Sequence, residues 1–86
     1  MADRENFIRR IAIEKDFYPE FFFNRVNTAT GKRYYISVLD NDGRNYLFTM
    51  DEKGSAWEIT KSSRVPGWIM AIKKKLEDAI FENTIR

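Results

Sequence analysis

Three of the four glycines close short polar clusters at nearly regular intervals. Gly31, Gly43 and Gly54 end the segments NTATG, DNDG and DEKG. Glycine readily adopts the positive φ that tight turns require, and Asp or Asn just before it can bond the local backbone. The runs around these clusters, FFFNRVN, RYYISVLD, NYLFTM and SAWEIT, are rich in aromatic and β-branched residues. Because such short connections cannot make parallel crossovers, we predict a four-stranded antiparallel meander over residues 20–60.

The pattern changes period after KSSRVPG, where apolar residues begin to recur at helical spacing. They fall within one arc of about 120°, the width expected for a helix lying on a sheet. The residues of this arc are Val65, Trp68, Ile69, Ile72, Leu76, Ala79 and Ile80. Pro66 suits a first turn, Ser62 or Ser63 could cap it, and Asn83 could end it. We therefore predict a helix over residues 66–83.

The N-terminal segment, residues 1–16, fits two structures. Ile11 and Ile13 alternate with charged or small residues, as in a strand, whereas Phe7, Ile8 and Ile11 also gather on one side of a helix. The abundance of good helix formers and a possible cap at Asp3 favour the helix slightly. The expected fold is a single α+β domain, in which a helix packs on one face of the meander and the N-terminus adds a helix or a further strand.

Alternation along the predicted strands separates a richly apolar face from a mixed one. The apolar face carries Tyr34, Ile36, Val38, Tyr46, Phe48, Met50, Trp57 and Ile59. This face should pack on the helix, since full burial of each such side chain is worth about 1.5–3 kcal/mol. The apolar residues left on the second face are Tyr35, Leu39, Leu47 and either Phe22 or the pair Phe21 and Phe23. The N-terminal segment could cover this second face or leave it free for a partner.

The composition removes large parts of enzyme chemistry. The chain has no cysteine and no histidine, so thiolate nucleophiles, imidazole bases and most zinc or transition-metal sites are excluded. A net charge of +2 allows nucleic acid without demanding it. Charges interrupt the N-terminus, and no apolar run approaches the roughly 20 residues that span a bilayer. We expect a cytoplasmic, non-enzymatic protein without cofactor, metal or membrane contact.

Two motifs have ordinary structural interpretations. The lysines of residues 73–75 would point about 100° apart on a helix, so they fan out instead of forming one basic patch. In DNDG, Asp40 and Asp42 match part of a calcium loop, but Val38 and Thr49 would occupy its first and twelfth positions. Neither residue supplies a carboxylate, so the segment is predicted to be a turn.

The leading functional hypothesis is a small binding module acting through protein contacts, as a homodimer. The residues expected to bind the partner are Tyr35, Leu39 and Leu47 on the second sheet face, and Met70 and Phe81 on the far side of the helix. Apolar side chains left outside the predicted core motivate this choice.

The alternative is binding of single-stranded DNA or RNA through the same sheet face and the basic turns. Tyr35 would stack on bases while cations contact phosphates. The candidate residues are Lys32, Arg33, Tyr35, Arg44 and Lys53. Four strands followed by a helix is an order also used by single-strand-binding domains of the Whirly and Pur type, whose characteristic residues are absent here.

Overall fold

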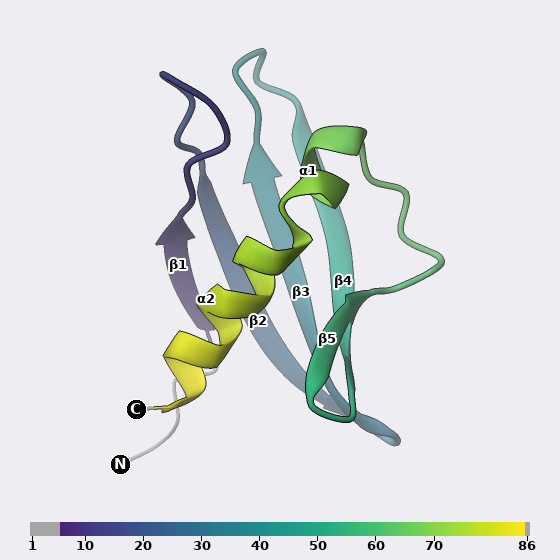
Figure 1. Ribbon diagram of the computed structural model, residues 1–86. Helices are drawn as coiled ribbons and strands as arrows, with labels where there is room; N and C mark the ends of the chain where they lie inside the picture. The colour runs from purple at the N-terminus through teal and green to yellow at the C-terminus, as the bar shows by residue number, and fades with distance from the viewer. Residues whose placement is uncertain (1–5, 86) are drawn as a thin grey trace.

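The computed structural model describes residues 6–85 of the 86-residue chain. The strands are β1 (Asn6–Arg10), β2 (Glu20–Thr28), β3 (Gly31–Leu39), β4 (Asn45–Lys53) and β5 (Ala56–Ile59). They form one antiparallel five-stranded sheet in the order β1-β2-β3-β4-β5. Two helices follow, α1 (Gly67–Ala71) and α2 (Lys73–Ile85), and cross one face of the sheet diagonally (Figure 1). The α+β architecture is confirmed, with one strand more than the predicted meander.

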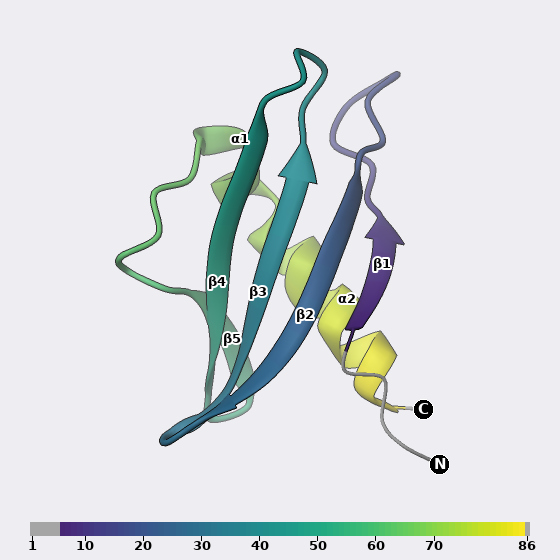
Figure 2. The same cartoon turned by 180° about the vertical axis from the view of Figure 1, so that it is seen from behind.

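The N-terminal segment forms a strand, so the preference for a helix there was wrong. β1 pairs with β2 from Asn6 opposite Asn24 to Arg10 opposite Glu20. The ring of Phe7 stacks on that of Phe23 at 4.4 Å, a tertiary contact that outweighs the local helix propensity. The suggested cap at Asp3 lies outside the described residues. β1 extends the sheet at its edge and leaves the second face uncovered (Figure 2).

The C-terminal helix is interrupted, contrary to the single helix expected from the sequence. Ile72, at φ −108° and ψ 19°, separates α1 from α2. Pro66 takes the N-cap position and no side chain caps α1; Ser63 instead accepts a hydrogen bond from the Thr49 N–H at 3.1 Å. α2 continues past Asn83, which therefore does not end it.

The core lies between the helices and the predicted apolar face of the sheet. The sheet contributes Phe21, Phe23, Tyr34, Ile36, Val38, Phe48, Met50 and Trp57, and the helices contribute Ile69, Ile72, Leu76, Ala79 and Ile80. Tyr46, Ile59, Val65 and Trp68 pack against this cluster as half-buried residues. The apolar arc of the helix and the inward face of the meander are therefore as predicted. The structure also decides the open alternative in β2, with Phe22 on the second face.

The turns lie at two opposite ends of the sheet. The turns after β2 and β4 share one end, whereas the β3–β4 turn is at the other (Figure 1). Asp40 organises the β3–β4 turn, its Oδ1 accepting hydrogen bonds from the N–H groups of Asp42 and Arg44 at 2.9 and 2.8 Å. The DNDG segment is thus a turn, as predicted. Within residues 6–85, neither helix is long and apolar enough to cross a membrane.

Candidate protein-binding surface

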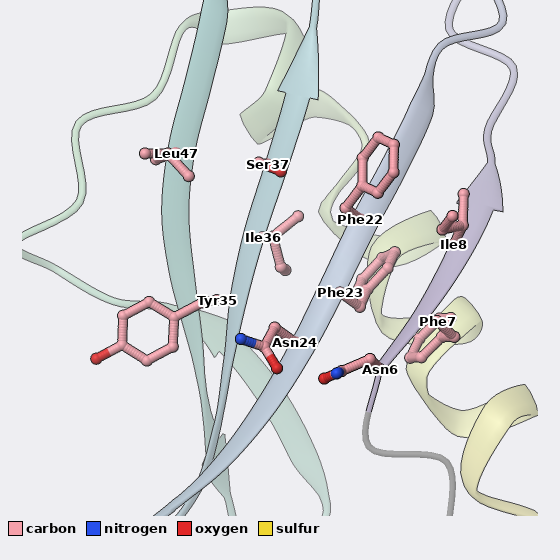
Figure 3. Close-up of a pocket in the computed structure, with 10 residues that line it drawn as sticks. All are labelled: Asn6, Phe7, Ile8, Phe22, Phe23, Asn24, Tyr35, Ile36, Ser37 and Leu47. Atoms are coloured by element: carbon pink, nitrogen blue, oxygen red, sulfur yellow. The ribbon is translucent and has the colours of Figure 1, made fainter.

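A row of side chains crosses the second sheet face perpendicular to the strands. Ile8 of β1 pairs with Phe22 of β2, Phe22 with Ser37 of β3, and Ser37 with Leu47 of β4. Paired residues on neighbouring antiparallel strands point to the same side, so these four form one continuous strip, called here the apolar row. Figure 3 shows the row from Leu47 to Ile8.

The large members of the apolar row are unusually exposed for their type. Leu47 is 68% exposed, Ile8 56% and Phe22 47%. Isolated surface hydrophobics are common, whereas three in one row, with only Ser37 between Phe22 and Leu47, form an extended apolar strip. Leu39 and Tyr35, both predicted for this face, lie beside the row and are also exposed.

A polar row runs parallel to the apolar row, two residues away along each strand. Asn6 is paired with Asn24, Asn24 with Tyr35, and Tyr35 with Thr49. The two rows border an open depression of about 620 Å³. Its floor, between the rows, is the backbone around Phe7, Phe23 and Ile36, and the side chains of Phe23 and Ile36 are buried in the core (Figure 3). The surface can therefore bury apolar groups while amide and phenol groups supply directional hydrogen bonds.

A hydrogen-bonded network closes one side of this face. Arg33 binds Asp51 through Nε–Oδ1 at 2.5 Å and Nη2–Oδ2 at 3.2 Å. The Thr60 hydroxyl donates to the same carboxylate at 3.0 Å, and Thr49 donates to Thr60 Oγ1 at 2.6 Å. Hydrogen bonds from Arg33 first, and from Thr60, lower the pKa of Asp51 below its ordinary value despite partial burial. The guanidinium is thereby committed to an internal partner.

The residues predicted to bind nucleic acid are brought together only in part, since Arg33 interacts with Tyr35 while Arg44 lies apart. Lys32 and Lys53 lie at the end of the sheet that carries the β2–β3 and β4–β5 turns, whereas Arg44 lies at the opposite end. Arg33 and Tyr35 share the second face, but the Arg33 guanidinium is held by Asp51. Glu52 lies near the basic end, since its Oε1 comes within 3.7 Å of the position that a Cβ on Gly31 would occupy.

On the helix side, the two residues predicted to bind a partner do not lie in one exposed patch. Met70 is exposed, but Phe81 is half-buried and packs against the core, so the two do not form a joint patch. The three lysines bind separate partners: Lys73 contacts Glu58 at 3.3 Å, Lys74 contacts Asp78 at 3.3 Å, and Lys75 donates to the Ala12 carbonyl at 2.8 Å. The predicted divergence of residues 73–75 is confirmed.

Sequence reasoning missed Ile8, because it placed the residue in a segment favoured as a helix. Two apolar residues, Phe7 and Ile8, precede two charged ones, Arg9 and Arg10, so no alternation marked the outward face. Among the described residues, no three acidic side chains gather closely enough to hold a metal ion.

Comparisons of the chain with protein-family models, with curated proteins and with solved structures return no match. Function must therefore be inferred from the surface itself.

Proposed function

We propose that the protein is a small non-enzymatic binding module that works as a homodimer and docks a protein on its second sheet face. The observation that carries the proposal is the apolar row of Ile8, Phe22 and Leu47, each about half exposed or more. A flat sheet face with an apolar centre and a polar margin has the composition of a protein interface. Tyr35 and Leu39 extend this surface on either side of the row.

The chemistry of the depression supports binding over catalysis. Its lining consists of apolar side chains, the amides of Asn6 and Asn24, the Ser37 hydroxyl and the Tyr35 phenol. No carboxylate or amine of the described residues belongs to this lining. A general acid–base pair needs two titratable groups with separated pKa values in reach of one substrate, and the depression provides no such pair.

The distribution of cations favours a protein over a nucleic acid as the partner. Nucleic-acid affinity depends mainly on cations that follow the phosphate backbone. Arg33 is neutralised by Asp51, and Arg44 lies at the far end from Lys32 and Lys53. Tyr35 and Phe22 both expose rings on which bases could stack, so stacking by itself does not decide between the two kinds of partner.

Site-specific photo-crosslinking tests the proposal in the cell. A benzophenone amino acid at Leu47 should give a protein adduct that is removed by protease and resists nuclease. The same probe at Lys61, an exposed loop residue outside the face, is the matched control. Equal yields at both positions, or an adduct that nuclease removes, would contradict docking of a protein on this face.

A further inference from the structure

Within residues 6–85, the outer edge of β1 carries backbone hydrogen-bonding groups that have no partner. The Ile11 N–H donates to the Pro19 carbonyl and the Ile13 N–H to the Phe17 carbonyl, so odd-numbered residues of this segment direct their backbone groups toward β2. Alternation in an antiparallel pair then directs the N–H and C=O of Ile8 and Arg10 away from the sheet.

The contact of Lys75 supports this assignment. Its Nζ reaches the Ala12 carbonyl from outside the sheet, as expected for an even-numbered residue of the same edge. For Ile8 and Arg10, no backbone partner on that side is found within residues 6–85.

The opposite edge of the sheet is protected. On β5, the Trp57 N–H donates to Glu77 Oε2 at 2.9 Å, so α2 covers the edge. Exposed edges with free N–H and C=O groups are templates for strand addition, and proteins commonly cover or charge them. The β1 edge is short, with Arg9 and Arg10 at its end, but nothing among the described residues covers Ile8.

We propose that β1 pairs with β1 of a second copy, antiparallel about a two-fold axis through Ile8. This pairing specifies the homodimer of the proposed function and leaves the second sheet face of each copy free for the protein partner. Ile8 would exchange both hydrogen bonds with Ile8 of the second copy, as in a hydrogen-bonded antiparallel pair.

Side-chain charges select this register. With the axis at Ile8, Arg10 faces Asn6 of the second copy and Arg9 faces Phe7, so no two cations are opposed. Within each copy Arg9 is paired with Glu82 and Arg10 with Glu20. The Asn6 amide oxygen can accept a further hydrogen bond from the Arg10 guanidinium of the second copy. An axis at Arg9 or Arg10 would set arginine against arginine and is disfavoured. The Ile8 axis also gives the full overlap of Asn6–Arg10.

The pairing joins the two apolar rows into one. Ile8 is the end member of each row, so the axis makes a continuous strip from Leu47 of one copy to Leu47 of the other. Pairing of two five-residue edges buries a small area compared with the roughly 1,600 Å² of a standard interface. We therefore expect a dimer that dissociates on dilution.

Cysteine cross-linking tests the register, because the chain contains no cysteine of its own. The Cα atoms of a hydrogen-bonded antiparallel pair lie about 5.5 Å apart, within disulfide range. Ile8→Cys should therefore form a disulfide-linked dimer under mild oxidation. Arg10→Cys, on the same edge, should not, because four residue steps would place its two copies about 13 Å apart. Equal cross-linking of both variants, or cross-linking of Arg10→Cys alone, overturns the pairing.

Light scattering during size exclusion over a dilution series tests the edge itself. Ile8→Pro removes the outward N–H without disturbing the β1–β2 ladder and should be monomeric, whereas Ile8→Val should remain dimeric. Far-ultraviolet circular dichroism checks that both variants are folded, and amide exchange at Arg10 should slow on dimerisation of the wild type.

A variant of the face separates this inference from the proposed function. Tyr35→Ser combined with Leu39→Ser leaves the β1 edge intact and, with the benzophenone probe at Leu47, should still dimerise while losing the protein adduct. A monomeric wild type, a dimeric Ile8→Pro variant, or loss of the dimer in the face variant overturns edge pairing. None of these results removes the photo-crosslink expected at Leu47.

Discussion

Arg33 and Asp51 face one another across β3 and β4 and are joined by two hydrogen bonds, at 2.5 and 3.2 Å. The pair occupies the side of the sheet that would have supplied a phosphate contact. The guanidinium of Arg33, predicted from the sequence to contact phosphate, is thereby held by an aspartate 18 positions away in the chain.

Acid should weaken the fold through Asp51. Its pKa is lowered in the folded state by the hydrogen bonds from Arg33 and Thr60, so the unfolded state binds the proton more tightly. The stabilisation is therefore complete well above the ordinary pKa of about 3.9 and is lost as pH falls through the lowered value. Asp51→Asn should cost about 1 kcal/mol at pH 7, with the difference shrinking below about pH 4.

Urea unfolding at several pH values measures this effect. Glu52→Gln, at an exposed neighbouring position on β4, is the matched control and should change stability little. A deficit of Asp51→Asn that stays constant from pH 7 to pH 3 would contradict the assigned role.

Truncation of a buried leucine should destabilise the protein far more than truncation of an exposed leucine on the second face. Leu76 is fully buried, so Leu76→Ala should lower the unfolding free energy by about 2–5 kcal/mol. Leu47→Ala removes the same atoms from an exposed position and should change it by no more than about 0.5 kcal/mol. Denaturant unfolding of the two variants provides the comparison. Similar losses would mean that Leu47 is buried in the free protein.

Glu77 should protect the β5 edge. Glu77→Ala leaves the Trp57 N–H without its acceptor and should cost about 1–2 kcal/mol. Glu77→Gln retains a carbonyl oxygen and should lose less than half as much. Thermal unfolding gives the stabilities, and amide exchange at Trp57 should be faster in the alanine variant alone. An unchanged exchange rate of the Trp57 amide in the alanine variant would show that Glu77 does not protect the β5 edge.

Binding of single-stranded oligonucleotides should be weak and only mildly dependent on salt. Lys32 and Lys53 can supply about two phosphate contacts, which predicts a log–log salt slope near −1.4, at about −0.7 per phosphate. Fluorescence anisotropy at low ionic strength measures the slope. A much steeper slope, together with loss of binding on Tyr35→Ala, would favour the nucleic-acid alternative over the protein partner.

The sequence alone determined the meander, the turns and the inward face. Glycines with Asp or Asn before them specify reversals locally, and alternation over several residues assigns Tyr34, Phe48 and Trp57 to one side without knowledge of any partner. The apolar arc of the C-terminal segment followed in the same way from its period. These features depend on contacts near in sequence or on a repeated pattern.

Tertiary structure decided what depends on pairing between distant segments. The N-terminal residues had no dominant period, and the stacking of Phe7 on Phe23 made them a strand. Register with β3 placed Phe22 on the second face, and the cross-strand Asp51 occupied the guanidinium of Arg33. Local propensities differ by only about 1 kcal/mol or less per residue, so burial of two aromatic rings outweighs them. The apolar row extends to Ile8 only because the N-terminal segment forms β1, which places Ile8 beside Phe22.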